Sequence, residues 1–161
     1  MKFRKLNPAW QAITLGALSG MRSVAGPAIA SHILSNRVSY KFSKTPLAFM
    51  QTKNVAGTLK VFAAAEFVAD KMPFAPNRTD APGLVVRVLA GSLAGASVYR
   101  VNNGNRFIGA VLGGAAALAS TFGSFYLRRV IVKKTKIADP LIGAMEDVLV
   151  AGAALSLAYG R

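Results

Sequence analysis

Cysteine is absent from this chain of 161 residues, and histidine occurs once, as His32. Without cysteine the protein has no disulfide framework, no thiolate nucleophile and no thiolate-ligated metal. One histidine is also too few for a histidine metal cluster, and the sequence offers no parts for a histidine-based triad. We therefore expect no metal, no cofactor and no enzymatic activity.

Acidic residues are scarce as well: six Asp and Glu stand against twenty Lys and Arg, for a net charge of +14. Charged residues make up 16% of the chain, below the roughly 25% of an average soluble domain. Apolar residues reach 53% and the mean hydropathy is +0.40, which excludes a disordered chain. A multi-pass membrane protein accounts for both features, because its apolar residues face lipid and its cations gather in loops.

We predict an all-α, polytopic transmembrane bundle that forms a single domain over residues 1–161. Its clearest span, residues 107–127, contains no charged residue and is long enough to cross about 30 Å of hydrocarbon. The run Asn102–Asn105 before it has the composition of a tight turn, so residues 84–101 and 107–127 predict a transmembrane hairpin. The five predicted spans are 11–34, 55–72, 84–101, 107–127 and 140–160.

The loops predict an orientation, because cations favour the cytoplasmic side. With five spans, the loops on the N-terminal side hold more Lys and Arg than those on the other side. We therefore expect a cytoplasmic N-terminus. A signal peptide is the alternative, with an apolar core at 9–21 and small residues at Ser23 and Ala25. Arg22 directly before that cleavage site, and the apolar pattern that resumes after it, argue against this alternative.

Glycines spaced four residues apart recur in the apolar segments. Such pairs let helix backbones approach closely in lipid, which fits packing within one chain as well as a homo-oligomer seam. The three pairs are Gly16 with Gly20, Gly91 with Gly95, and Gly109 with Gly113.

A weak internal repeat at an offset of 97 residues matches Gly16, Ser23 and Gly26 with Gly113, Ser120 and Gly123. With an odd span between the two halves, this repeat would be inverted, as in many small transporters.

Ionisable residues lie within the predicted spans. A charge at the bilayer centre costs about 2.5–3.5 kcal/mol on insertion scales, so such groups pair or line a polar cavity. The sequence leaves two interpretations open: a site for a solute or ion, and ion pairs that hold helices in register. The candidates are Arg22, Glu66, Asp70, Lys71, Glu146 and Asp147, with Arg78 and Arg87 as anion-binding candidates in loops.

The first predicted span contains Gly26 and Pro27 near its middle. Proline removes a backbone hydrogen bond and clashes with the preceding turn, so we expect a break in the helix. A broken helix in a membrane exposes a helix N-terminus to anions. Arg22 beside such a break could hold a phosphate or a carboxylate, although a kink with no ligand is the commoner outcome.

Several strings resemble a family of small bacterial membrane proteins known as domain of unknown function 4126. They are Gly20–Ser23, the run from Glu66 through Asp70 and Lys71 to Pro73, Arg78–Thr79, and the stretch from Gly91 to Gly95. The resemblance covers residues 12–155. It implies a helical inner-membrane protein with a glycine-rich interior and no settled activity. It also implies that one defining feature comprises Arg22, Glu66, Asp70, Lys71 and Pro73.

Three functions follow from these observations. The first is binding or transport of a small charged solute or ion through the cluster around Arg22, Glu66 and Glu146. The second is a non-catalytic membrane scaffold, in which the charges are structural and the basic loops bind anionic lipid headgroups. The third, the alternative to the expected non-enzymatic role, is an enzyme acting on a lipid. Acids or metal ligands for it would be Glu66, Asp70 and Asp80 near Arg78, but no convincing nucleophile accompanies them. Nucleic-acid binding is not expected, because no aromatic residues alternate with the cations to stack bases.

Overall fold

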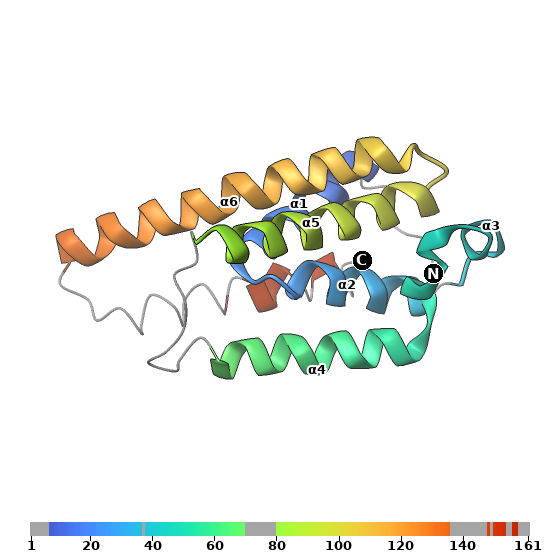
Figure 1. Cartoon of the computed structure of the whole chain (residues 1–161), viewed down its shortest axis with the longest axis horizontal. Coiled ribbons are helices and arrows are strands. Elements are labelled where there is room, and N and C mark those ends of the chain that lie inside the picture. Colours follow the sequence, from blue (N-terminus) through green and yellow to red (C-terminus); the bar gives the residue numbers. More distant parts are fainter. Residues whose placement is uncertain are drawn as a thin grey trace.

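The computed structural model describes residues 7–36, 38–69, 80–135, 148, 150–153 and 156–157. Every regular element within these residues is a helix, and we number them as in Figure 1. They are α1 (Pro8–Met21), α2 (Ala25–Ser35), α3 (Tyr40–Ser43), the 3-10 helix η1 (Pro46–Gln51), α4 (Lys53–Ala69), α5 (Ala81–Val101) and α6 (Arg106–Thr135). The predicted all-α class is confirmed.

Helices α5 and α6 form an antiparallel hairpin along the length of the molecule (Figure 1). They correspond to the predicted spans 84–101 and 107–127. Both are long and apolar enough to cross a membrane, and they are the two helices of the described residues with this property. Helix α5 begins earlier than predicted, because Pro82 lies in its first turn, where a missing backbone N–H costs nothing.

Residues 8–35 form a second hairpin, and the predicted single span over 11–34 is wrong. Helix α2 runs back along α1 (Figure 1), so that Leu15 shares a buried cluster with Ala30 and Leu34. In one straight helix Leu15 and Ala30 would lie about 22 Å apart. Because the start of α1 and the end of α2 lie at the same end of the bundle, the cation count no longer supports a cytoplasmic N-terminus.

The two hairpins meet along α1, α5 and α6, where glycines face backbone. A Cβ on Gly16 would lie 2.8 Å from the carbonyl carbon of Gly113, and a Cβ on Gly91 would lie 2.7 Å from the Cβ of Ala117. Gly95 and Gly109 face each other in the same way. These glycines therefore face helices of their own chain and do not form an exposed seam for a second copy.

The predicted inverted repeat is also wrong, because the two segments that it relates have different structures. Residues 8–35 are two helices joined by a sharp turn, whereas residues 106–135 are one uninterrupted helix. Proline explains the difference, because Pro27 corresponds to Ser124 at the proposed offset. Serine keeps its backbone N–H, so α6 continues through that position.

Helices α3 and η1 close one end of the bundle, and the sequence pattern did not predict them. Phe42 of α3 and Met50 of η1 are fully buried in the cluster that contains Leu15. The Ser31 hydroxyl of α2 donates to the carbonyl oxygen of Met50 at 2.8 Å. The side chain of Gln51 accepts from the backbone N–H of Ser39. Helix α4 then returns along the outside of α2 toward the hairpin tip (Figure 1).

Of the fifth predicted span, residues 140–160, only positions 148, 150–153 and 156–157 are described, and all are helical. Val150 is buried against Leu18 and Ala25 near the tip of the first hairpin. The remainder of this span lies outside the described residues.

Candidate functional site

The tip of the α1–α2 hairpin, Arg22–Val24, is the point where apolar helix gives way to polar groups. Helix α1 ends at Met21, and Arg22 is extended, with φ −138° and ψ 112°. Pro27 explains the position of this break. Its ring would clash with the carbonyl of Ser23 in a continuous helix, but it is tolerated in the first turn of α2. The break thus falls a few residues before Gly26 and Pro27.

Glu66 of α4 caps the N-terminus of α2. One carboxylate oxygen, Oε1, accepts from the backbone N–H of Ser23 at 2.8 Å and from the Ser23 hydroxyl at 2.6 Å. The other, Oε2, accepts from the backbone N–H of Val24 at 3.0 Å. A negative charge at the positive end of a helix is stabilising, and charge-assisted hydrogen bonds are stronger than neutral ones. A residue 43 positions along the chain therefore serves as the cap.

Arg22 makes the reciprocal contact with α4. Its Nη1 donates to the backbone carbonyl of Glu66 at 3.3 Å. That carbonyl lies near the C-terminal end of α4, where a positive charge is favourable. The side chain of Arg22 is buried, with 3% of its surface exposed. We call Arg22, Ser23, Val24 and Glu66 the hairpin clasp.

The carbonyl groups of α1 just before the break also have hydrogen-bond donors. The backbone N–H of Arg22 donates to the carbonyl of Leu18 at 2.8 Å. The hydroxyl of Thr121 on α6 donates to the carbonyl of Gly20 at 3.1 Å, and Thr121 is itself 1% exposed. Irregular backbone is tolerated inside a bilayer only where protein groups or a water-lined cavity complete its hydrogen bonds.

The clasp can bind an anionic group. It brings together two backbone N–H groups, a hydroxyl and the start of a helix, which is the arrangement by which helix N-termini hold carboxylates and phosphates. The guanidinium of Arg22 contacts the backbone carbonyl of the residue that carries the carboxylate. In this structure the anion is the carboxylate of Glu66. Among the described residues, no group of three or more His, Asp and Glu could hold a metal.

The structure brings two of the predicted site residues together, Arg22 and Glu66. The other predicted site residues within the spans, Asp70, Lys71, Glu146 and Asp147, lie outside the described residues, as does Arg78.

Arg87 was predicted as an anion-binding residue in a loop, and this placement is wrong. It lies in the second turn of α5 with 7% of its surface exposed, because α5 already begins at Ala81.

Ser23 and Val24 are the clasp residues that the sequence reasoning missed. Ser23 stands in the string that carried the family resemblance, but its role depends on Glu66, and nothing in the local pattern joins the two. Thr121 was missed because a hydroxyl in an apolar helix commonly bonds within its own helix. It does so here as well, donating to the carbonyl of Ala117 at 2.8 Å.

Comparison with curated proteins finds no match, and comparison with solved structures finds none either. Comparison with protein families does find one. The match is to the family described as domain of unknown function (DUF4126), and it covers residues 9–159, which include both hairpins and the clasp. The chain therefore belongs to the DUF4126 family, as the resemblance in its sequence predicted.

Proposed function

We propose that this chain is a small multi-pass protein of the bacterial cytoplasmic membrane that binds or transports a small charged solute at the hairpin clasp. The observation that carries the proposal is the Glu66 carboxylate held on the N-terminus of α2, beside the buried Arg22. In this proposal α5 and α6 cross the bilayer, and the α1–α2 hairpin enters and leaves on one side.

The distribution of side chains supports a lipid environment. Fully buried positions include small polar residues such as Ser19, Ser97 and Thr121, whose hydroxyls donate to carbonyls one turn earlier. Large apolar residues lie outside, and soluble monomers rarely expose so many together. On α5 and α6 those at least half exposed are Val85, Val86, Leu89, Phe107, Val111, Tyr126 and Leu127.

The glycine contacts between α1, α5 and α6 support the same environment. In lipid, helices do not associate by the hydrophobic effect, and close backbone approach at small residues takes its place. Gly91 and Gly113 provide such an approach.

A solute with a carboxylate or phosphate group would replace the carboxylate of Glu66 at the clasp. Its oxygens would accept from the same donors on Ser23 and Val24, and Arg22 would neutralise its charge. The packing of α4 supports this exchange, because its main contacts are with α2 and η1 at the edge of the bundle. The end of α4 that carries Glu66 can therefore separate from the tip without disturbing α5 and α6. Asp70, Lys71, Glu146 and Asp147 remain predicted members of this site.

Proteoliposomes test the proposal with radiolabelled phosphate and radiolabelled succinate as probes. We expect uptake of at least one probe above that of protein-free liposomes. Arg22→Gln should lower it about tenfold, the size of one lost charge-assisted hydrogen bond. Glu66→Gln should raise it, because this change removes the carboxylate that competes with the solute for the donors of Ser23 and Val24. Asp80→Asn is the matched control, because it removes one negative charge from an exposed residue that makes no capping hydrogen bond. Uptake that all variants share would contradict the proposal.

A membrane scaffold is the second candidate, and the saturation of the Glu66 carboxylate favours it. Both oxygens already accept from this chain's own donors, as expected if the clasp only fixes the hairpin to α4. In that case Glu66→Gln and Arg22→Gln would lower the unfolding temperature in detergent, and wild-type liposomes would take up neither probe.

A further inference from the structure

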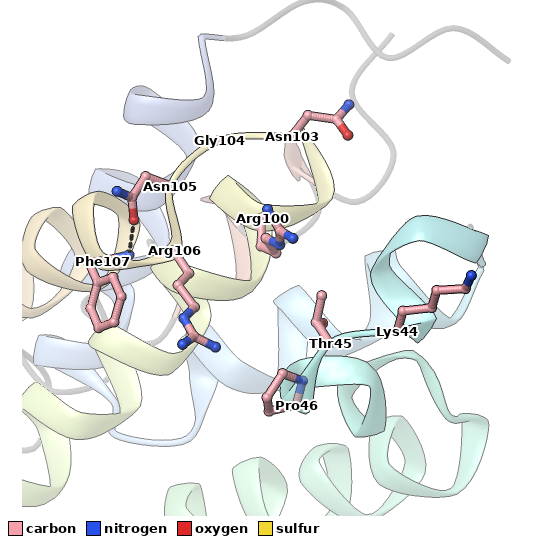
Figure 2. A pocket seen from close by; sticks show the side chains of 9 residues that line it. All are labelled: Lys44, Thr45, Pro46, Arg100, Asn103, Gly104, Asn105, Arg106 and Phe107. Atoms are coloured by element: carbon pink, nitrogen blue, oxygen red, sulfur yellow. Dashed lines mark hydrogen bonds between the residues drawn. The ribbon is translucent and has the colours of Figure 1, made fainter.

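The end of the bundle opposite the clasp contains an open cavity of about 580 Å³. One wall is the junction of α3 and η1, at Thr45 and Pro46. The other is the turn from α5 to α6, with Arg100 and Arg106 on either side of it. In Figure 2 Arg106 extends toward Pro46 and Arg100 lies near Thr45, whereas the ammonium group of Lys44 points away from both arginines. We call this cavity the basic pocket.

The positive charge of the basic pocket has no acidic residue nearby in the sequence. Residues 1–65 and 81–138, which supply both walls, contain no Asp or Glu. The two side-chain carboxylates among the described residues lie at the other end of the bundle. Glu66 binds the hairpin tip, and Asp80 is the N-cap residue of α5. Helix α5 has 21 residues and is about 31 Å long, several times the screening length of about 8 Å at physiological ionic strength.

The arginine wall is rigid. The backbone N–H groups of Asn103 and Gly104 donate to the carbonyls of Arg100 and Tyr99 at 3.0 and 2.9 Å, which is the Schellman motif that ends a helix. Asn103 adopts the left-handed conformation that this motif requires, with φ 62°. The side chain of Asn105 accepts from the backbone N–H of Phe107 at 2.9 Å and starts α6. Arg100 and Arg106 are thus held on a fixed turn.

The facing wall is anchored in the core. Phe42 is 1% exposed, and its carbonyl accepts from the Thr45 hydroxyl at 2.7 Å. Lys44 lies over the ring of Tyr40, with its Nζ 4.9 Å from the ring centre. The pocket is therefore formed before any ligand enters.

We propose that the basic pocket binds a phosphate group. A guanidinium donates two parallel hydrogen bonds to phosphate oxygens, so two arginines on one turn can hold a tetrahedral anion. The N-terminal end of α6 adds partial positive charge to the same wall. The cavity is large enough to take the glycerol portion of a headgroup as well. The phosphate comes from an anionic phospholipid or from free phosphate in solution.

The lipid source follows from the proposed membrane position and does not depend on solute binding at the clasp. If α5 and α6 cross the bilayer, their connecting turn lies at the level of the headgroups. An anionic lipid there would meet two exposed arginines at the bilayer surface, where each cation adds about 1 kcal/mol to lipid binding.

Native mass spectrometry of the full chain released from detergent micelles tests this inference. The probes are phosphatidylglycerol, phosphatidylcholine and inorganic phosphate. We expect phosphatidylglycerol to bind the wild-type chain at least about tenfold more tightly than phosphatidylcholine, because the two arginines that hold the phosphate repel the trimethylammonium group of phosphatidylcholine. The double variant Arg100→Gln/Arg106→Gln should abolish this preference.

Two further variants make the test specific. Lys60→Gln/Arg129→Gln removes two exposed cations from α4 and α6 and should keep the preference. Arg100→Lys keeps the charge but loses the planar donor pair, so it should show an intermediate preference and keep the test valid if the double variant fails to fold.

Competition by inorganic phosphate at millimolar concentration identifies free phosphate as a ligand of the same site, and its absence assigns the site to lipid. Equal loss of the preference in the Lys60→Gln/Arg129→Gln control would overturn the inference, because any basic surface would then suffice. Failure of the wild-type chain to bind either phosphate source would overturn it as well. The preference for phosphatidylglycerol is measured separately from solute uptake, so failure at the clasp and failure at the pocket are distinguishable.

Discussion

The backbone groups at the turns of the two hairpins find their hydrogen-bond partners in different ways. The turn of α5–α6 satisfies its own hydrogen bonds, through Asn103 and Asn105 within the turn itself. The turn of α1–α2 cannot, and it depends on Glu66, 43 residues further along the chain. A self-capped turn stays formed whatever its neighbours do. A turn capped by another helix can be released when that helix moves, as the proposed exchange of Glu66 for a solute requires.

The contact between the hairpins is where substitution should have its largest effect. In Gly113→Leu a side chain would enter the space now occupied by the backbone of Gly91 and Gly95. Overpacking costs about 1–3 kcal/mol and occasionally more, and we expect a loss above this range because α5 would have to separate from α6. Thermal unfolding in detergent measures the loss. Gly123→Leu is the control, since no atom beyond the adjacent backbone of its own helix lies within 4 Å of its Cβ position. An equal loss there would contradict the close packing.

Glu66→Gln weakens the cap of the α1–α2 turn and leaves the α5–α6 turn unchanged. Glutamine offers one carbonyl oxygen, so its NH₂ group would face one of the two backbone N–H groups of Ser23 and Val24. A hydrogen bond to a charged group contributes about 1.5–3 kcal/mol, and we expect a loss of this order in unfolding free energy. Asp80→Asn should change stability by less than about 0.5 kcal/mol, as most surface substitutions do. Equal effects of the two variants would mean that the cap is not what stabilises the tip.

Ser23→Ala tests the same cap from the other side, because it removes one of the three donors to the Glu66 carboxylate. The hydroxyl contributes one hydrogen bond to the carboxylate, while the backbone N–H of residue 23 remains. We expect a loss of about 1 kcal/mol in chemical denaturation, smaller than that of Glu66→Gln. Ser156→Ala provides the reference, because the Ser156 hydroxyl is exposed and bonds only to the carbonyl of Ala153 in the same turn of helix.

At the α5–α6 turn, substitutions of Asn103 should change stability only through the backbone conformation of that residue. Asn103→Gly removes the Cβ at a residue with φ 62°, where glycine is favoured, and should leave stability unchanged or slightly raised. Asn103→Val should lose about 1 kcal/mol, because a β-branched side chain clashes with the backbone in the left-handed conformation, which asparagine tolerates. Unfolding temperatures in detergent compare the two. If both variants lost stability equally, the side chain of Asn103 would be the stabilising group instead of its backbone conformation.

Sequence alone predicted the α5–α6 hairpin well, and the reason is local. Residues 107–127 carry no charge, arginines stand at both ends, and the turn between the helices consists of residues that favour turns. All the information that defines this hairpin lies within it. The helices accordingly begin and end near the predicted limits, except that α6 continues past the predicted end to Thr135.

The first hairpin was missed because the contacts that define it involve residues far from its turn in the sequence. Residues 11–34 are apolar with only Arg22 and His32 interrupting them, which is also the pattern of a single span. Pro27 predicted a break but gave no angle for it. The reversal of direction depends on the buried cluster that contains Leu15 and Ala30 and on the cap from Glu66. The basic pocket was also missed, although the long stretches without acidic residues were a visible signal for it.

The distance between Trp10 and Asn36 tests directly whether residues 8–35 fold back at the clasp. The two residues lie equally far along the chain from the tip, and both are exposed. Because the chain has no cysteine, spin labels on Trp10→Cys and Asn36→Cys would attach at these positions alone. With helix axes about 8–10 Å apart, double electron–electron resonance should give a distance below about 25 Å. A distance near 39 Å, that of one continuous helix, would contradict the hairpin and the site built on its tip.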